Sequence, residues 1–290
     1  MLSRVRALAA PRPHLRHHTA LMLWRLAGLV CLIGMSLSLC AGCLSPAVST
    51  ELTASDAPTV ITTEPRTLRV GQSANATPIV MDVFGTGDDT VLVLGGVHGD
   101  EPTGAAVARQ VAAYLKQHHA QLVGRTVAII AEVNPDGLQA GTRANARGVD
   151  LNRNYPSSDW RRGKRGRLSH GTGPASEPET RAVVRAIELI QPKRIIDIHS
   201  IKRGHHCNNY DGPGAALAAV LAECNGYAVE PSIGYATPGC VGSWTGIDLR
   251  IPTITLELPR DLDAMACWQE NGTALLAFVQ AGPPTTLAAK

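Results

Sequence analysis

Short apolar runs alternate with amphipathic segments from about residue 77 to residue 280, and this pattern predicts the secondary structure. Strands are expected where the runs are short and continuous, at residues 77–85, 90–99, 125–133, 194–200 and 251–258. Helices are expected at residues 102–119, 176–191, 215–229 and 263–279. Ser176 and Glu179 have the spacing of a capping box for the second of these helices, and Pro178 falls in its first turn.

Strands that alternate with helices predict an α/β fold built in layers. The strand segments are apolar along their whole length, so we expect both faces of the sheet to be covered. Neither an internal repeat nor a second linker interrupts residues 67–283. One domain is therefore expected there, followed by a short tail at residues 284–290.

The first 42 residues have the character of an export signal. An apolar stretch at residues 26–43 follows Arg25 and is shorter than the ~20 residues that a membrane-spanning helix needs. Its end, CAGC, resembles the bacterial lipobox, which implies lipid on Cys43; plain secretion and an uncleaved anchor are the alternatives. Met22 is an alternative start of translation. Residues 43–66, rich in Ser, Thr, Ala and Pro, are expected to be a flexible tether, so we expect an exported lipoprotein held at a membrane of the cell envelope.

The net positive charge of the chain comes from residues 1–42. The whole chain has 27 basic and 24 acidic residues, but residues 1–42 contain five arginines and no acid. The remainder has 22 basic and 24 acidic residues, a formal charge of −2. This balance argues against a nucleic-acid-binding protein.

Two expected strands end in residues that can bind a metal. His98 and Glu101 follow one strand, in the segment VLVLGGVHGDEPTG, and His199 ends another. In α/β folds, ligands bind outside the carboxyl ends of the strands. Two imidazoles and a carboxylate form a catalytic zinc set that leaves one coordination position for water. The alternative for His98 and Glu101 is a loop histidine beside a helix-capping acid.

Two further features favour an active site at these strand ends. Glu257 lies inside an apolar strand. Burial of a carboxylate there is unfavourable unless the group is paired or lies at the edge of a cleft. Glu257 is therefore either a general base or an ion-paired residue at a strand end. The segment GTRANARGVDLNRNY, residues 141–155, is rich in arginine and asparagine, which suits binding of a carboxylate or an oxyanion; a solvated loop is the alternative. Asp150 in this segment can also orient a histidine ligand.

The motifs HGDE, NPDG, GTRANARGVDLNRNY, SEPETRAV, DIHS and TLELP occur in this order between about residues 90 and 260. Together they resemble the zinc carboxypeptidases, and within them the bacterial murein peptide amidases. The resemblance implies a three-layer α/β/α fold with a mixed sheet of about eight strands. It also implies one zinc ion (Zn2+), bound by His98, Glu101 and His199.

The same resemblance assigns roles to other residues. It implies that Arg143 polarises the scissile carbonyl and that Glu257 is the general base. Asn152 and Arg153 would bind a terminal carboxylate of the substrate, and Asp150 would be the partner of His98. Tyr235, in GYATPG, would contact the substrate.

The expected function is zinc-dependent hydrolysis of a peptide bond next to a free carboxylate. In muropeptide substrates this would be the γ-D-glutamyl–meso-diaminopimelate bond. The alternatives are a general metallocarboxypeptidase for ordinary peptides, a zinc deacylase of the aspartoacylase type, and a non-catalytic envelope-binding lipoprotein. The segments GVDLNRN and NPDG favour a peptidase over a deacylase, and the full set of ligands with Glu257 argues against a non-catalytic protein.

Three features stay open from sequence alone. The basic loop at residues 160–170 is either a solvated insertion or a device that attracts anionic substrates. The segment HHC at residues 205–207 is a weaker alternative for metal binding. Four cysteines after the signal allow three disulfide pairings, or all are free: Cys207, Cys224, Cys240 and Cys267.

Overall fold

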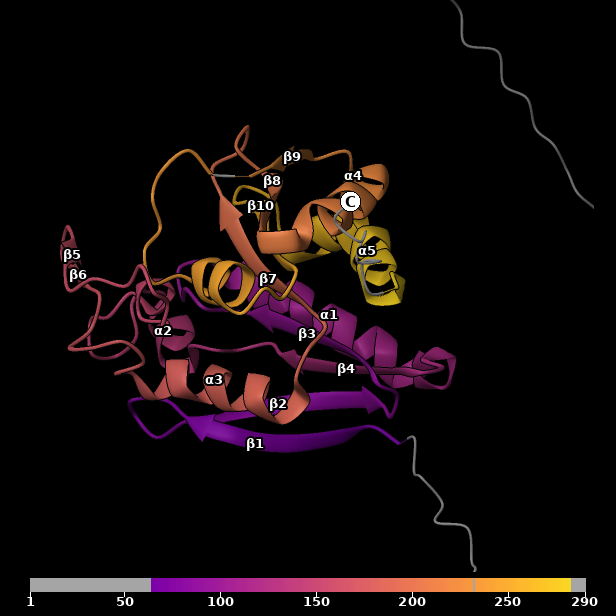
Figure 1. The fold of residues 1–290 in the computed structure, drawn as a ribbon, viewed down its shortest axis with the longest axis horizontal. Coiled ribbons are helices and arrows are strands. Elements are labelled where there is room, and N and C mark those ends of the chain that lie inside the picture. Colours follow the sequence, from indigo (N-terminus) through magenta and orange to yellow (C-terminus); the bar gives the residue numbers. More distant parts are fainter. Residues whose placement is uncertain (1–63, 232, 283–290) are drawn as a thin grey trace, which may run out of the picture. The chain divides into compact units, whose positions relative to one another are not determined.

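An eight-stranded mixed sheet forms the centre of the computed structural model, which describes residues 64–231 and 233–282 (Figure 1). In spatial order the strands are β1 (Arg66–Gln72), β2 (Pro78–Gly85), β4 (Arg125–Ile130), β3 (Asp89–Gly95), β7 (Arg194–Ile201), β10 (Thr253–Pro259), β8 (Cys207–Asp211) and β9 (Ala228–Glu230). The central strands β4, β3, β7 and β10 are parallel, whereas β2 and β8 pair antiparallel with their inner neighbours. The predicted α/β fold with a mixed sheet of about eight strands is confirmed.

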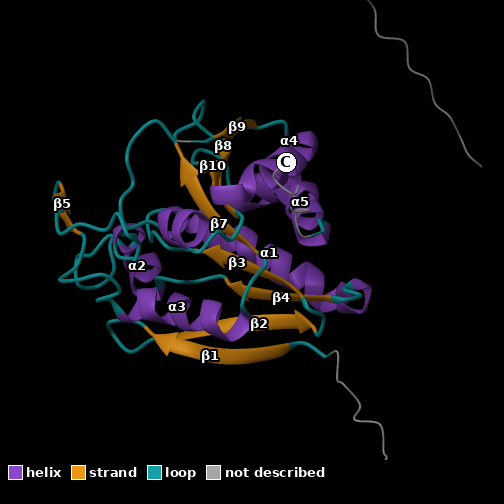
Figure 2. Ribbon diagram, viewed as in Figure 1, coloured by secondary structure: helices purple, strands orange, loops and turns teal. Residues whose placement is uncertain are grey.

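Helices cover both faces of the sheet (Figure 2). On one face, the apolar core joins the strands to α1 (Pro102–His118), α4 (Ala215–Asn225) and α5 (Ala264–Gln280). On the other face, it joins them to α3 (Pro178–Ile190) and to a π-helix, η4 (Gly242–Asp248). This is the three-layer arrangement that the fully apolar strands predict.

Shorter elements lie in the connections. These are α2 (Pro135–Ala140), the hairpin of β5 (Lys164–Arg165) and β6 (Leu168–Ser169), and the 3₁₀ turns η1 (His119–Gln121), η2 (Leu151–Arg153) and η3 (Gly212–Gly214).

Successive side chains of the central strands point to opposite faces of the sheet, so core residues and site residues alternate. In β10, Ile254, Leu256 and Leu258 belong to the core beneath α1, α4 and α5. Thr255 and Glu257, between them in sequence, therefore point to the opposite face, which η4 and α3 cover. Glu257 is the direct register partner of His199 in the parallel pair of β10 and β7. The strand periodicity thus puts Glu257 and His199 side by side on one face.

The start of α1 lies against the end of β7 because residue 104 is glycine. A Cβ atom at Gly104 would be 2.3 Å from the carbonyl oxygen of Ile198. Only glycine permits this approach, and it places Glu101, just before α1, beside the end of β7 that carries His199. Glu101 is the N-cap residue of α1 but makes no side-chain capping bond, so its carboxylate is available to the site.

The predicted end of one strand and the predicted cap of one helix are wrong. The strand expected at residues 125–133 ends at Ile130, and NPDG begins helix α2, where the Asn134 side chain accepts a hydrogen bond from the N–H of Gly137 at 2.9 Å. The capping box at Ser176 and Glu179 does not form, because α3 has Glu177 at its N-cap and no side-chain capping bond. Glu179 instead accepts a hydrogen bond from the N–H of Ala74 at 2.8 Å, which ties α3 to the chain after β1.

The helix expected at residues 215–229 is also too long. It ends at Asn225, because Gly226 takes a left-handed conformation with φ of 68°, and Ala228–Glu230 then forms the edge strand β9. The strand β8, with the polar sequence CNNYD, is not predicted from the pattern of apolar residues.

Several sequence-based expectations concern residues outside the described ranges. The export signal, Cys43 and nearly all of the tether lie there, as does the tail at 284–290; β1 begins at Arg66, the last residue assigned to the tether. None of the described helices has the length and apolar character needed to cross a bilayer. The four cysteines left open above are all free: Cys207, Cys224, Cys240 and Cys267.

Candidate functional site

A cavity of about 310 Å³ lies at the carboxyl ends of the central strands. Its lining includes most residues predicted for the site: His98, Glu101, Arg143, Asn152, Arg153, His199, Tyr235 and Glu257. Asp150 does not line the cavity; it is fully buried behind His98. A cavity of this size with converging polar groups is the usual form of a small-molecule or active site.

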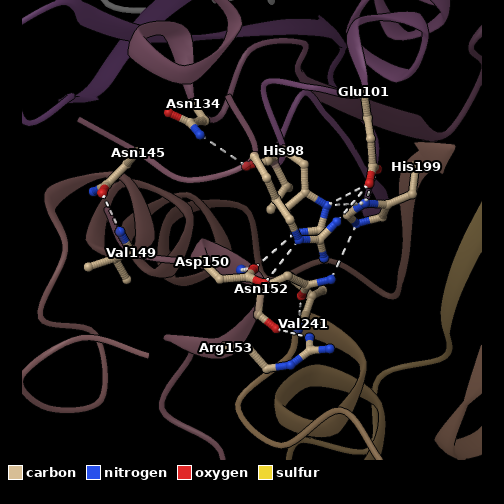
Figure 3. Close-up of polar contacts among 12 residues, drawn as sticks. His98, Glu101, Asn134, Asn145, Val149, Asp150, Asn152, Arg153, His199 and Val241 are labelled. Atoms are coloured by element: carbon tan, nitrogen blue, oxygen red, sulfur yellow. Dashed lines mark hydrogen bonds and ion pairs between the residues drawn. The ribbon is translucent and has the colours of Figure 1, made fainter. Parts of the chain in front are cut away.

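His98, Glu101 and His199 point toward one another at one side of this cavity (Figure 3). The two Nδ1 atoms of the imidazoles are 3.1 Å apart. The Glu101 carboxylate places one oxygen 3.2 Å from Nδ1 of His98 and the other 2.9 Å from Nδ1 of His199. All three residues are at most 4% exposed.

Each imidazole is held from its other side by a buried carboxylate. Nε2 of His98 is 3.0 Å from Asp150, as the resemblance implied, and Nε2 of His199 is 2.8 Å from Asp197. Asp197 was not identified from the sequence, although it lies two residues before His199 in a strand and so shares its face. A carboxylate on the outer nitrogen fixes the imidazole orientation and leaves the inner nitrogen free to bind a metal.

The charges in this cluster are strongly coupled. Burial opposes a charged imidazole, but Asp197 and Glu101 outweigh it and raise the pKa of His199 well above its ordinary value. Likewise, burial opposes ionisation of Glu101, but the two histidines outweigh it and hold the pKa of that carboxyl well below its ordinary value. The imidazoles and carboxylates of this cluster therefore favour each other's charged forms.

The donor atoms fit a zinc ion. Ligands at about 2.0–2.1 Å from one tetrahedral zinc lie about 3.3 Å from each other, close to the separations seen here. In the described part of the chain, His98, Glu101 and His199 are the one group of three or more such residues that could hold a metal. The weaker candidate HHC at residues 205–207 forms no such group; His206 instead packs edge-on against Tyr227, with ring centroids 4.5 Å apart.

Two arginines contact the Glu101 carboxylate from the cavity side. Arg143 donates to Glu101 at 3.0 Å and to Asp150 at 3.1 Å. It therefore bridges one predicted metal ligand and the carboxylate that holds His98. Arg260 also donates to Glu101, at 2.9 Å, and to the carbonyl oxygen of Ser200. Arg260 was not identified from the sequence, because an arginine after a strand end is common.

Asn152 and Arg153 lie on the other side of His199, in the 3₁₀ turn η2. Asp150 caps this turn by accepting a hydrogen bond from the N–H of Asn152 at 3.1 Å, and the Asn152 side chain accepts one from Val241 at 3.0 Å. Arg153 is only 4% exposed, yet its guanidinium forms no ion pair with a described carboxylate. A buried guanidinium that lines a cavity without a counter-ion is suited to bind an anion.

The Glu257 carboxylate lines the site without a hydrogen-bond partner among the described residues. It is 8% exposed, and no described group donates to it. Burial raises the pKa of Glu257, and Glu101 adds to that rise, while the histidines oppose it. A carboxyl group with an elevated pKa and no fixed partner is able to accept and return a proton.

Tyr235 lies at the outer part of the cavity and is 45% exposed. The guanidinium carbon of Arg165 is 5.0 Å from the centre of its ring. Arg165 belongs to the β5–β6 hairpin, which is formed by the basic loop at residues 160–170, and it also lines the cavity. The basic loop therefore contributes a cation to the site.

Asp197→Asn tests the outer hydrogen bond of His199. An asparagine has nearly the same shape but no charge, so we expect zinc affinity to fall by about 10- to 100-fold, measured by competition with a chelator. Asp261→Asn is the matched control, because Asp261 is exposed and pairs with Arg203 outside the cavity. Equal zinc affinity in Asp197→Asn and the parent protein would contradict the role of Asp197 in holding His199.

Comparison with known proteins supports the same interpretation. A family model described as zinc carboxypeptidase matches residues 60–211. Murein peptide amidase A of Escherichia coli strain K12 is 33% identical over 216 residues, which cover 67% of this chain and 82% of that protein. Murein peptide amidase A of Vibrio campbellii is 30% identical over 209 residues, covering 66% of this chain and 78% of that protein.

Solved structures agree with the fold. The murein-tripeptide amidase of Escherichia coli O157 superposes with a TM-score of 0.61 at 29% identity, covering 75% of this chain and 92% of that chain. Bovine thrombin-activatable fibrinolysis inhibitor, solved with tick carboxypeptidase inhibitor, gives a TM-score of 0.63 at 19% identity, which is likeness of fold alone. With the family model matching more than half of the 290 residues, the chain belongs to the zinc carboxypeptidase family of hydrolases.

Proposed function

We propose that this protein is a zinc-dependent amidase of murein peptides that cleaves the γ-D-glutamyl–meso-diaminopimelate bond. The observation that carries the proposal is the convergence in one cavity of a metal-ligand set, the unpartnered carboxylate of Glu257 and the unpaired guanidinium of Arg153. The names of the relatives, murein peptide amidase A, support the choice of substrate.

The chemistry needs an acid–base group beside the attacked carbonyl. A zinc ion bound by His98, Glu101 and His199 would polarise that carbonyl and lower the pKa of a water molecule. Glu257 takes a proton from the attacking water and returns it to the leaving nitrogen. Its raised pKa keeps it basic enough for the first transfer and acidic enough for the second.

Arg143 is placed to stabilise the developing oxyanion. Its Nε and one Nη atom are held by Asp150 and Glu101, and its other Nη atom has no described partner. A guanidinium fixed in this way need not reorganise when negative charge forms on the substrate oxygen.

Asn152 and Arg153 hold the other end of the substrate. Arg153 supplies a planar fork for a carboxylate, and Asn152 is fixed by its bond from Val241. A free carboxylate on the leaving residue, bound there, sets the peptide bond before that residue against Glu257.

The action of the protein in the cell envelope is a proposal from sequence alone. It depends on the export signal at residues 1–42 and on lipid at Cys43. Such an anchor would attach the enzyme to a membrane at the compartment in which murein is assembled.

The substrate is tested directly with the purified, zinc-loaded protein. We expect it to release meso-diaminopimelate from the tripeptide L-Ala-γ-D-Glu-meso-diaminopimelate, and to cleave ordinary α-linked peptides with a kcat/KM lower by about a hundredfold or more, read by mass spectrometry. Faster cleavage of ordinary peptides would indicate a general carboxypeptidase instead. Release of an acyl group from N-acyl amino acids alone would indicate a deacylase.

Glu257→Gln separates catalysis from metal binding. The amide keeps the size of the side chain but accepts no proton, so we expect kcat to fall by about 10²- to 10⁴-fold while the zinc content stays at that of the parent protein. Zinc is measured by elemental analysis and turnover by product release. Near-normal turnover in this variant would exclude Glu257 as the base.

Arg153→Lys tests the carboxylate clamp. Lysine keeps the charge but lacks the planar fork, so cleavage of the tripeptide should weaken by about tenfold or more, or roughly 1.4 kcal/mol of transition-state stabilisation. Amidating the terminal carboxylate of the tripeptide should cause a similar loss in the parent protein and little further loss in the variant. Equal rates for the amide and the free acid in the parent protein would mean that the clamp is not used.

A further inference from the structure

The carboxylates behind the two imidazoles of the site are held unequally. Behind His98, both oxygens of Asp150 are bound: Oδ1 lies 3.0 Å from Nε2 of His98, and Oδ2 accepts from Arg143 at 3.1 Å. Behind His199, Oδ2 of Asp197 lies 2.8 Å from Nε2. Its other oxygen, Oδ1, is buried without a hydrogen-bond partner among the described residues.

A carboxylate bound at one oxygen only is poorly suited to fix an imidazole. Its plane can turn about the Cβ–Cγ bond, because torsions of this kind have broad minima. Asp197 is fully buried, so bulk water does not reach its free oxygen. Since nearly all buried polar atoms have a partner, the second contact of Asp197 is expected from a neighbouring side chain, directly or through an internal water molecule.

Tyr155 has a second buried polar atom without a described partner, its hydroxyl oxygen. It is the last residue of the segment at 141–155, and none of the roles above uses it. Its ring stacks on Trp244 of η4 with centroids 5.9 Å apart, and its N–H donates to Gly239 at 2.9 Å. Three residues earlier, the Asn152 side chain lies 3.4 Å from Nε2 of His199, so this segment passes beside β7.

Tyr155 and Asp197 lie on the same face of the sheet. Tyr155 belongs to the core cluster that contains Ile195, and Asp197, two residues after Ile195 in β7, points to that face as well. Burial raises the pKa of Tyr155 well above its ordinary value, and the negative charge of Asp197 adds to the rise. The hydroxyl therefore stays protonated and is available as a donor near this carboxylate.

A water molecule fits between the two oxygens better than a direct bond. Neither the Tyr155 hydroxyl nor Oδ1 of Asp197 has a described partner within hydrogen-bonding distance, so they do not bond to each other. Thr255 stands beside Asp197 as its register partner in β10, and the hydroxyl of Thr255 also has no described partner. A buried water typically makes about three hydrogen bonds to groups of this kind.

We propose that Tyr155 is a positioning residue for His199, acting through one buried water molecule that it shares with Asp197. The hydroxyl donates to the water, the water donates to Oδ1 of Asp197, and Oδ2 accepts from Nε2 of His199. The second contact fixes the plane of the carboxylate and so the direction in which Nδ1 of His199 meets a metal. The inference deepens the proposed function, because it rests on zinc at His199, but it is independent of the substrate.

The zinc affinities of four proteins test this link: the parent, Tyr155→Phe, Asp197→Asn and the double variant. Tyr155→Phe removes only the hydroxyl, so zinc affinity, measured by competition with a chelator, should fall by about three- to tenfold. This loss is smaller than the 10- to 100-fold expected for a group that bonds directly to a ligand. In the Asp197→Asn background the same change should alter the affinity by about twofold or less, because the charge-assisted contact is already lost.

Tyr227→Phe is the matched control. Tyr227 is also buried and its hydroxyl donates to Glu270 at 2.7 Å, but it does not line the cavity. This variant should lower the midpoint of thermal unfolding of the metal-free protein and keep the parental zinc affinity. A purely structural role of Tyr155 would give the same result in Tyr155→Phe.

A crystal structure of the zinc-loaded parent protein tests the water directly, even if Tyr155→Phe does not fold. One water should lie within about 3.0 Å of both the Tyr155 hydroxyl and Oδ1 of Asp197. The absence of this water, unchanged zinc affinity in the folded Tyr155→Phe, or an equal loss in both backgrounds would overturn the role of Tyr155. If zinc binding responds as expected but the tripeptide is not cleaved, the proposed function fails and the role of Tyr155 stands.

Discussion

The parallel register between β7 and β10 is the constraint on which the whole site depends. His199 and Glu257 are direct partners in that register, on strands about 4.8 Å apart, so both side chains enter the cavity from one face. A slip of one residue would turn one of them into the core beneath α1 and α5. Ile198 and Leu256, which are at most 1% exposed, prevent this slip because they would have to leave the core. The apolar core thus determines where the polar chemistry lies.

Glu101 connects the separate parts of the site electrostatically. Its carboxylate contacts both imidazoles and both guanidinium groups of Arg143 and Arg260. Burying so many charges is unfavourable unless each has a partner, and in this cluster the carboxylates and cations alternate. Arg153 forms no ion pair and Glu257 has no side-chain hydrogen bond with a described residue, and both line the cavity, where a substrate can supply the missing contacts. The unpaired groups, more than the paired ones, define what the cavity can bind.

The sequence predicted the parts of the fold that depend on apolar periodicity. The central strands and the long helices were found because continuous runs such as RIIDIHS have few alternatives once both faces are buried. The predictions failed where tertiary contacts decide local structure. Ser176 and Glu179 have the spacing of a capping box, but Glu179 bonds to the chain after β1 instead. β8 is polar and short, so its pairing with β10 could not be read from its own residues. Asp197 was missed because one buried acid in a strand resembles any other until its partner is known.

The contact between Tyr235 and Arg165 links the β5–β6 hairpin to the rim of the cavity. Stacking of this kind at an exposed position contributes about 0.5–1 kcal/mol, which favours the stacked state over the free one by only roughly two- to fivefold. A sizeable fraction of molecules therefore has a free tyrosine ring at any moment. An anion that engages Arg165 competes with the ring for the same guanidinium, and by reciprocity an inward turn of the ring leaves Arg165 more open to anions. Anion binding at Arg165 and the orientation of the Tyr235 ring are thus linked in a single equilibrium.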